Sequence, residues 1–353
     1  MNRKRMLKTM VAGAVGVGTA GLLAGVGALV AGRAMWHSFS SVSLSGNVVL
    51  ITGASRGLGL ALAEECVENG CRLAICGRDE ESLRRAEREL RAMGAEVLAL
   101  RCDVGKRPEV ERMVRDVIAH YGKIDLLINN AGTIAVGPLN AQTIEDFQEA
   151  MDVMFWGAVH TTLLVLPHML ERGKGRIANV TSIGGKMAVP HLLPYSAAKF
   201  AITGFSEGIT TELADKGIKV TTVIPGLMRT GSHVNAFFKG DHRAEYAWFG
   251  VSASTPLLAM SAQRAAQRIV RAIRQGQTEV TLGLPAKIAA LAHGLAPATT
   301  VRALGLANRA LPVSADDSKA RHRGNQCEGA ATKSPLTVFG KSAAKRWNQK
   351  KLA

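Results

Sequence analysis

Three residues near the middle of the chain, Ser182, Tyr195 and Lys199, have side chains that together could carry out proton transfer. A phenol titrates at about pH 10, which is too high for a general acid or base at neutral pH unless its anion is stabilised. A helix beginning near Tyr195 would place the Lys199 ammonium on the same face, where it would lower the pKa of the phenol. Ser182 could hydrogen-bond a substrate carbonyl from the other side. The pattern predicts a carbonyl-reduction site, in which tyrosine gives a proton to the oxygen while hydride arrives at the carbon.

A glycine-rich segment at residues 52–59 (TGASRGLG) lies between an apolar run at 48–51 and a predicted helix. Glycines let the backbone turn tightly, and they let a pyrophosphate approach the free N–H groups at the start of the helix. Such a loop is weak evidence when it stands alone and strong evidence between a buried strand and a helix. The cofactor contacts predicted in it are Gly53, Ser55, Arg56, Gly57, Leu58 and Gly59.

The end of the second apolar run, at 72–76, should lie beside the adenosine ribose of a bound dinucleotide. An acidic side chain there favours NAD. This chain has Gly77 and Arg78 at that point, with Arg56 in the preceding loop. Two guanidinium groups would pair with a 2′-phosphate, so the sequence predicts NADP (NADPH) as the cofactor. The alternative is that Arg78 is a solvated loop arginine.

The elements that position these residues follow a regular alternation from about residue 42 to residue 284. Helical stretches, such as 80–93 with apolar residues three and four apart, separate short apolar runs. Runs that are apolar on both faces and alternate with helices predict a parallel sheet covered on both sides. The expected fold is therefore α/β, a doubly wound parallel sheet (Rossmann fold). The predicted strands are 48–51, 72–76, 96–102, 125–129, 176–181, 219–224 and 279–282.

Five motifs in this order and spacing resemble the short-chain dehydrogenase/reductase family over roughly residues 44 to 284. They are TGASRGLG, NNAG at 129–132, Ser182, YxxxK at 195–199 and PG at 225–226. The resemblance implies that Ser182 orients the carbonyl, that Tyr195 exchanges the proton, and that Lys199 lowers the tyrosine pKa and holds the nicotinamide ribose. It also implies cofactor contacts from Asp103, Val104, Asn130, Ala131, Gly132, Pro225, Gly226 and Thr230.

One position departs from the family pattern. The family usually has an asparagine about 24 residues after NNAG, which is thought to hold a water of the proton relay, and this chain has Met154 there. A methionine has no amide to hold that water. We expect a working enzyme with an altered relay, because Ser182, Tyr195 and Lys199 are intact. The alternative is a catalytically weak NADP-binding scaffold or sensor on a membrane.

The net charge of +16 is concentrated at the two ends of the 353-residue chain. Residues 1–9 contribute +4 and residues 313–353 contribute +6, which leaves +6 for the rest. No basic stripe with interleaved aromatic residues accompanies it, so the pattern favours attraction to a membrane surface and argues against nucleic-acid binding. The five cysteines lack metal-ligand spacing, so we predict no metal site. The first four, Cys66, Cys71, Cys76 and Cys102, are expected to be small, reduced core residues.

Residues 9–32 are uncharged, follow a basic cluster and are long enough to cross a bilayer. A cleavable signal is the alternative, because residues 32–34 form a small-x-small site. The positive-inside rule would carry the catalytic domain of a spanning protein away from cytoplasmic NADPH. A shallow anchor, a lumenal compartment with its own NADPH or export of a folded protein would each remove this conflict. We expect a membrane-associated protein whose catalytic domain faces the cytoplasm.

The chain is expected to have four parts. These are a basic N-terminus with the hydrophobic segment (1–33), the NADP-binding catalytic domain (42–284), an amphipathic helical extension broken at Pro297 (285–312) and a basic disordered tail (313–353). The extension could rest on a bilayer, pack on the sheet or contact a partner subunit.

The segment between Thr230 and Pro256 is the expected substrate lid. It holds five of the sixteen aromatic residues of the chain. Together with the hydrophobic N-terminal segment, these aromatics predict a small lipophilic carbonyl or alcohol as substrate, and packing of the aromatics in the core is the alternative. The family resemblance also implies a homo-oligomer, because members often form dimers or tetramers.

Overall fold

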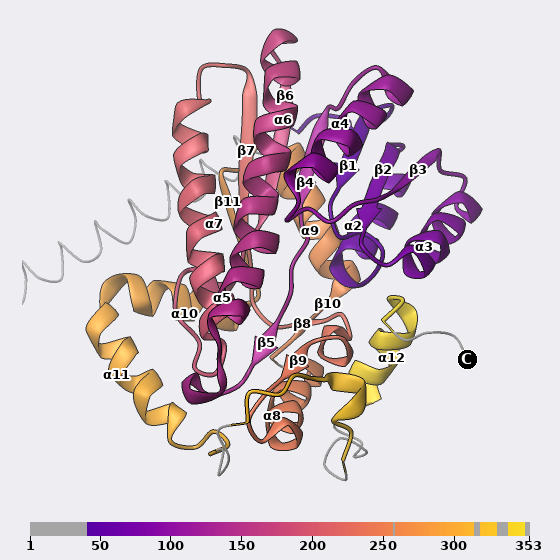
Figure 1. Cartoon of the computed structure of the whole chain (residues 1–353). Helices are drawn as coiled ribbons and strands as arrows, with labels where there is room; N and C mark the ends of the chain where they lie inside the picture. The colour runs from indigo at the N-terminus through magenta and orange to yellow at the C-terminus, as the bar shows by residue number, and fades with distance from the viewer. Residues whose placement is uncertain (1–40, 257, 314–317, 330–337, 350–353) are drawn as a thin grey trace, which may run out of the picture.

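The computed structural model describes residues 41–256, 258–313, 318–329 and 338–349. The predicted membrane segment at 9–32 lies outside these residues. The architecture is a central sheet with helices on both faces, and smaller elements gather beyond the carboxyl ends of its strands (Figure 1).

Seven parallel strands form the central sheet in the order β3-β2-β1-β4-β6-β7-β11. Each predicted strand is present, with ends that differ by at most one residue, and the doubly wound α/β fold is confirmed. The strands are β1 (Val48–Ile51), β2 (Arg72–Gly77), β3 (Val97–Arg101), β4 (Leu126–Asn129), β6 (Gly175–Val180), β7 (Ile218–Pro225) and β11 (Glu279–Leu282).

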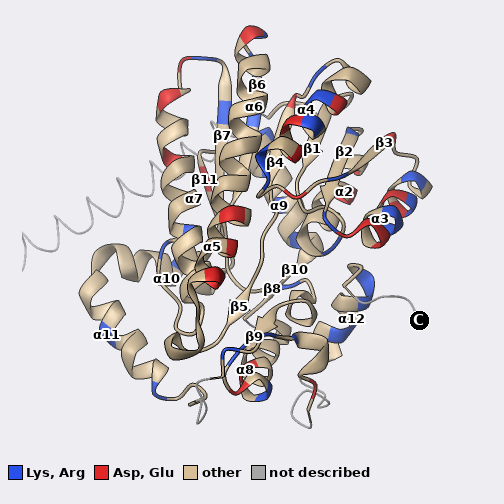
Figure 2. Cartoon of the chain, in the orientation of Figure 1, with Lys and Arg blue, Asp and Glu red and all other residues tan. Residues whose placement is uncertain are grey.

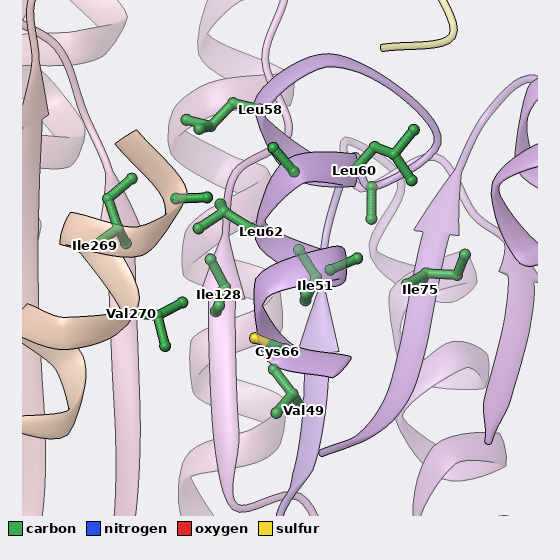
Figure 3. Packing of buried hydrophobic residues seen from close by; sticks show 14 of the residues in the cluster. Val49, Ile51, Leu58, Leu60, Leu62, Cys66, Ile75, Ile128, Ile269 and Val270 are labelled. Atoms are coloured by element: carbon green, nitrogen blue, oxygen red, sulfur yellow. The ribbon is translucent and has the colours of Figure 1, made fainter. Parts of the chain in front are cut away.

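The two faces of the sheet carry separate hydrophobic clusters. Val49 and Ile51 of β1 belong to one cluster and Val48 and Leu50 to the other, because successive side chains of a strand point to opposite faces. Figure 3 shows the first cluster, where α9 packs beside α2 over the sheet. The first face is covered by α2 (Gly57–Glu68), α3 (Glu80–Ala92) and α9 (Ala262–Arg274), and the second by α4 (Arg107–Tyr121), α6 (Gly157–Glu171) and α7 (Leu193–Glu212).

One long helical stretch, Ile144–Glu171, runs through α5 (Ile144–Met151), the π-helical turn η2 (Asp152–Trp156) and α6. Among the described residues it is the helix with the length and apolar composition to cross a membrane. Half of the most apolar segment of this helix is buried inside the protein, and the buried residues include Val153, Met154 and Val165 of the second core cluster. The stretch therefore packs in the core, against one face of the sheet.

The predicted extension forms two helices, α10 (Leu284–Leu295) and α11 (Pro297–Asn308), with the break at Pro297 as expected. Only Ala286 of α10 is buried, and α11 has no buried residue. In Figure 1 helix α11 stands away from the sheet, whereas the start of α10 contacts the end of β11. The apolar side of this pair is thus exposed in the single chain.

The prediction of a disordered tail over 313–353 is wrong for the parts that the structure describes. Strand β12 (His322–Arg323) pairs with β9 (Phe237–Phe238), which pairs with β5 (Ala135–Val136). Helix α12 (Val338–Arg346) follows, and Trp347 after it is buried in the first core cluster. The tail shows no periodic apolar pattern, because only a few separate residues attach it to the rest of the protein. The residues that they contact are far away in the sequence.

The predicted lid contains the 3₁₀ turn η4 (Ser232–Val234) and helix α8 (His242–Ser254). Phe238, Tyr246 and Phe249 are buried in a small cluster of their own together with Cys327. The core-packing alternative therefore accounts for three of the five aromatic residues. All five cysteines are free and buried, which was expected for Cys66, Cys71, Cys76 and Cys102.

Candidate active site

A cavity of about 700 Å³ lies at the carboxyl ends of the parallel strands, where open α/β sheets bind their ligands. Every predicted site residue lines it, although these residues come from widely separated parts of the chain. They are Gly53, Ser55, Arg56, Gly57, Leu58, Gly59, Arg78, Asp103, Val104, Asn130, Ala131, Gly132, Ser182, Tyr195, Lys199, Pro225, Gly226 and Thr230.

The three candidate catalytic residues meet at one end of the cavity. Ser182 directly follows β6, and its Oγ accepts a hydrogen bond from Gly184 N at 3.0 Å. Tyr195 and Lys199 lie one turn apart on α7. The Lys199 Nζ donates to Val180 O at 2.8 Å and lies 5.7 Å from the centre of the Tyr195 ring. The strand end and the helix thus aim a hydroxyl, a phenol and an ammonium at one region.

The electrostatics of this group differ from the prediction. Burial raises the pKa of Tyr195, and a hydrogen bond with Ser182 offsets only part of that rise. Burial also lowers the pKa of Lys199 to about 8. The expected lowering of the tyrosine pKa is therefore wrong for this form of the protein, because removal from water disfavours the charged form of each group. At neutral pH the phenol is protonated, which suits a group that gives its proton to a carbonyl oxygen.

The glycine-rich loop packs so closely that side chains would not fit. A Cβ atom on Gly53 would lie 2.8 Å from Ala131 Cα, and Gly53 has a φ of +64°. A Cβ on Gly59 would lie 2.3 Å from Gly53 O. Helix α2 opens at Gly57, whose N–H donates to Trp347 O, and the next two residues of the helix, Leu58 and Gly59, also line the cavity. This cradle fits the pyrophosphate of a dinucleotide, which needs backbone donors at close range.

The two asparagines of NNAG have different places. Asn129 points into the core, where its Nδ2 donates to Asn179 Oδ1 at 2.9 Å. Asn130 holds the loop, since its Nδ2 donates to Thr52 O at 3.0 Å and to Gly53 O at 3.2 Å. Asn130 thus lines the cavity and also keeps the glycine-rich loop in register with β4.

The adenosine end of the cavity is strongly basic. Burial lowers the pKa of Arg56, and neighbouring cations lower it further against the opposing effect of Asp79. These cations are Arg323, Arg78 and Arg85. Asp79 is occupied as the N-cap of α3, where Oδ1 accepts from Ser82 N at 2.9 Å. A cluster of guanidinium groups in partial burial fits a phosphate dianion.

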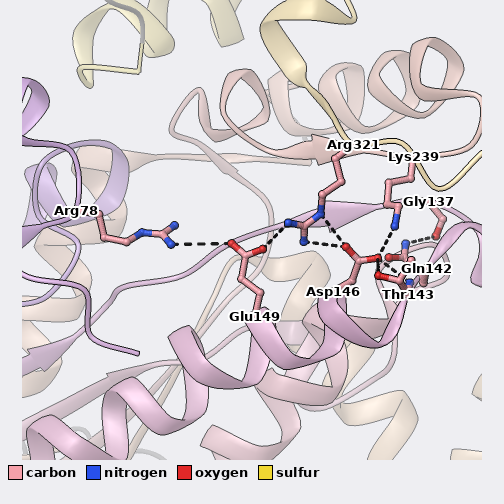
Figure 4. Close-up of polar contacts among 8 residues, drawn as sticks. All are labelled: Arg78, Gly137, Gln142, Thr143, Asp146, Glu149, Lys239 and Arg321. Atoms are coloured by element: carbon pink, nitrogen blue, oxygen red, sulfur yellow. Dashed lines mark hydrogen bonds and ion pairs between the residues drawn. The ribbon is translucent and has the colours of Figure 1, made fainter. Parts of the chain in front are cut away.

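Sequence reasoning missed Arg85 and Arg323 at this end of the cavity. Arg85 looks like any charged residue of an amphipathic helix, and Arg323 lies in the tail that was expected to be disordered. Figure 4 shows a second tail arginine nearby, Arg321, which bridges Glu149 at 2.7 Å and Asp146 at 2.8 Å. Glu149 lies 4.0 Å from Arg78, so this carboxylate leaves Arg78 only loosely paired.

The remaining predicted contacts lie where the strands end. Asp103 follows β3, and its Oδ1 accepts from Gly105 N at 3.2 Å. Gly226 follows β7 and donates to Leu282 O at 3.1 Å. Thr230 is buried, and its Oγ1 accepts from Ser232 N at 3.3 Å. All three residues line the cavity.

Met154 is buried in the π-helical turn η2, behind the cavity wall. Its Sδ would lie 3.6 Å from a Cβ built on Gly132. A void of about 10 Å³ is lined by Met154, Asn129 and Val180, among others. That volume is at the lower limit for one water molecule. The thioether thus fills most of the space in which a polar side chain could have held water.

Comparison with known proteins agrees with this geometry. The family described as short chain dehydrogenase matches residues 47–238. SadH of Mycobacterium tuberculosis, a protein named as an oxidoreductase, is 37% identical over 248 residues, which are 69% of this chain and 89% of SadH. The 11-beta-hydroxysteroid dehydrogenase A of Sesamum indicum is 34% identical over 245 residues, covering 68% of this chain and 69% of that protein.

A solved structure gives the same result. A single-residue variant of the actinorhodin polyketide ketoreductase, solved with NADPH, superimposes with a TM-score of 0.60 at 32% identity. The match covers 69% of this chain and 97% of the ketoreductase. The chain therefore belongs to the short-chain dehydrogenase/reductase family and is an NAD(P)-dependent oxidoreductase acting on an alcohol group or the corresponding carbonyl.

Proposed function

We propose that this protein is an NADP-dependent oxidoreductase that acts on a lipophilic carbonyl or secondary alcohol at a membrane surface. The observation that carries the cofactor preference is the group of arginines around Arg56 at the adenosine end of the cavity. The ketoreductase whose structure resembles this chain was solved with NADPH, which supports the same preference.

The chain's own residues would handle the proton and the orientation of the substrate. The nicotinamide, when bound, supplies or accepts the hydride. Ser182 donates a hydrogen bond to the carbonyl oxygen, and Tyr195 gives that oxygen its proton. Lys199, held by Val180 O, stabilises the phenolate that remains. In the oxidative direction the same groups take the proton from the alcohol.

The cofactor preference can be tested by measuring the dissociation constants of NADPH and NADH. Arg56→Ala should weaken NADPH binding by roughly 10- to 100-fold, since a hydrogen bond to a charged group is worth about 1.5–3 kcal/mol. NADH binding should change little. Arg84→Ala is the control, because this arginine lies outside the cavity, is exposed to solvent and pairs with Glu80. Equal losses for both cofactors would contradict the role of these arginines.

Support for a lipophilic substrate comes from the cavity walls near the candidate catalytic residues. Ile134 lines the cavity and belongs to the same apolar cluster as Tyr195, and a related protein is named as a hydroxysteroid dehydrogenase. The rate of NADPH consumption should rise with the apolar length of a series of ketones and aldehydes, and Tyr195→Phe should abolish it. A preference for sugars or charged acids would refute this part of the proposal.

The proposed membrane contact rests on α10 and α11. Their exposed apolar residues are accompanied by Lys287, Arg302 and Arg309 and by no acidic residue (Figure 2). The apolar set is Leu284, Ile288, Leu291, Leu295, Val301 and Leu306, each more than half exposed. A basic apolar surface of this kind suits an anionic bilayer. The catalytic domain would then face the cytoplasm.

Co-sedimentation with vesicles tests this contact separately from the segment at 9–32. The double variant Leu291→Ser, Leu295→Ser should reduce binding to anionic vesicles. The double variant Met93→Ser, Leu139→Ser is the control, because these two exposed apolar residues lie outside α10 and α11 and outside the proposed oligomer surface. Unchanged binding by the first variant would remove α10 from the proposal.

A homo-oligomer is part of the proposal and uses a different surface. Trp156, Leu163 and Phe200 are exposed large apolar residues on η2, α6 and α7. Light scattering on the purified protein should report a dimer or tetramer, and Leu163→Arg should shift it toward the monomer. A monomeric wild-type protein would refute this point.

The second candidate function, a weakly active NADP-binding scaffold or sensor, is favoured by one observation, which is Met154 in place of a polar residue beside the cavity. It predicts NADPH binding without turnover on any carbonyl tested. Tyr195-dependent turnover would exclude it.

A further inference from the structure

The last described residues of the chain lie across one end of the cavity. We call residues 338–349 the C-terminal strap. It consists of α12 and of Trp347, Asn348 and Gln349 after it. Helix α12 packs against α8 and β8 (Met228–Arg229), beside the ends of α2 and α3 (Figure 1). Asn348 and Gln349 line the cavity together with the glycine-rich loop.

The strap is bonded directly to the phosphate-binding loop. Gly57 N, the first N–H group of α2, donates to Trp347 O at 2.9 Å. Asn348 Nδ2 donates to Ser55 O at 2.7 Å and to Ser82 O at 2.9 Å. The strap therefore joins the loop to the start of α3, which are the two elements that flank the adenosine end of the cavity.

The strap also positions one of the arginines. Arg85 Nε donates to Asn348 Oδ1 at 2.7 Å. Arg85 Nη1 donates to Glu81 Oε1 at 2.7 Å and Nη2 donates to Ser82 Oγ at 3.3 Å, so three partners hold the guanidinium. Asn348 is buried and has a left-handed φ of +55°, which asparagine tolerates better than most residues. Its side chain thus makes three hydrogen bonds from a conformation that few other residues would adopt.

Close packing shows that the strap is built into the fold. A Cβ on Gly231 would lie 2.3 Å from Ala344 Cα, so the chain needs a glycine where α12 crosses it. Arg346 forms a bidentate ion pair with Glu64, in which Nη1 donates to Oε1 at 2.9 Å and Nη2 donates to Oε2 at 2.6 Å. The Trp347 side chain is 6% exposed and belongs to the core cluster under α2. The strap is anchored at both ends of its contact with α2.

The far side of the strap contacts the predicted substrate lid. Asn235 Nδ2 donates to Gln349 O at 2.8 Å and to its Oε1 at 2.7 Å. A Cβ on Gly57 would lie 2.8 Å from Gln349 Nε2, so the amide nitrogen lies against the phosphate-binding loop. Gln349 thus bridges the lid and the loop and lines the cavity beside the loop that would bind a pyrophosphate.

We propose that the C-terminal strap is a cofactor-binding element that closes over the phosphate end of the bound dinucleotide. With the strap in place the cavity still measures about 700 Å³, which is within the ordinary range for a ligand site. The strap is therefore a wall of the site and leaves room for the ligand. Asn348 positions Arg85 and the loop, and Gln349 offers an amide donor to the pyrophosphate. Cofactor release requires the strap to leave α2.

This inference rests on the proposed function only in taking the ligand to be a nicotinamide dinucleotide. The strap contacts the loop that receives the pyrophosphate, which NAD and NADP share. The test is therefore run with whichever of NADPH and NADH the unaltered full chain binds more tightly.

The experiment measures the dissociation constant and the dissociation rate of the cofactor by stopped-flow fluorescence in the full-length protein. Asn348→Ala should weaken binding on the order of 10-fold, because a buried set of hydrogen bonds is lost. The change should appear mainly as faster dissociation of the cofactor. Ser342→Ala is the control, since Ser342 is an exposed residue of α12.

A second variant covers the case in which Asn348→Ala destabilises the fold. Gln349→Glu keeps the shape of the side chain and puts a carboxylate beside the loop, so it should weaken cofactor binding more at low salt than at high salt. Tighter binding or higher activity in either variant would show a strap that competes with the cofactor and would overturn the inference. Unchanged dissociation in both variants would overturn it as well. A wild-type protein that binds neither cofactor would refute the proposed function and the inference together.

Discussion

Replacing Lys199 by methionine should stabilise the fold near neutral pH while removing a candidate catalytic group. Lys199 is 5% exposed, and burial lowers its pKa from 10.5 to about 8. A tenfold change in proton affinity corresponds to about 1.4 kcal/mol, so holding this ammonium in the folded protein costs about 3 kcal/mol. Methionine has a similar length and carries no charge, so this cost disappears in the variant.

The sign of the pH dependence follows from the two pKa values. The unfolded chain keeps the lysine proton up to about pH 10.4, whereas the folded protein releases it at about pH 8. The cost is therefore fully present below pH 8 and is lost as the pH rises toward 10.5. The wild-type protein should gain about 3 kcal/mol relative to Lys199→Met across this window. The lost hydrogen bond to Val180 O lowers the stability of the variant at both ends of the window, so the change with pH isolates the charge.

Urea unfolding of the wild type and the variant at pH 7 and pH 10.5 measures this change. Lys174→Met is the matched control, because Lys174 is an exposed lysine and its replacement should give a difference that stays nearly constant with pH. A constant difference for Lys199→Met as well would mean that Lys199 is well solvated, and the reasoning about its burial would be refuted. Activity should be lost in Lys199→Met whatever its stability.

Three further substitutions test other parts of the structure. Met154→Asn should raise kcat and shift its pH profile, and an unchanged profile would show that this position has no part in proton transfer. Gly53→Ala should lower the free energy of unfolding by more than Gly94→Ala. Both glycines have a positive φ, but only a Cβ on Gly53 would also meet the backbone of Ala131. Equal losses of stability in urea titrations would contradict the close approach of Gly53 to Ala131. Asp146→Asn should cost about 3–5 kcal/mol, because it leaves the buried Lys239 without its carboxylate. Burial raises the pKa of Asp146, but its hydrogen bond to Lys239 and other contacts lower it overall. In thermal unfolding experiments the wild-type protein should therefore lose this stability as the pH falls below about 4, whereas the Asp146→Asn variant should show no such loss.

The sequence determined the sheet, the order of its elements and the candidate chemistry. Strands and helices are encoded by local periodicity, and the core-facing runs of this chain are long enough for the alternation to be unambiguous. The glycine-rich loop could be assigned because its place between a strand and a helix is itself local. Ser182, Tyr195 and Lys199 could be assigned because two of them share a helix face and the third ends a strand, so the parallel fold brings them together.

Only the tertiary structure decided where the tail packs and how burial changes the pKa values at the site. Arg85 and Asn348 are 263 residues apart, and Ser55 and Asn348 are 293 apart, so no pattern in the neighbourhood of either residue shows the contact. The raised pKa of Tyr195 was also hidden, because burial depends on every element packed around the phenol, whereas the spacing to Lys199 shows one neighbour only. Periodicity reports which face of an element is buried. It does not report which distant segment covers that face, and in this protein that segment forms part of the wall of the cofactor cavity.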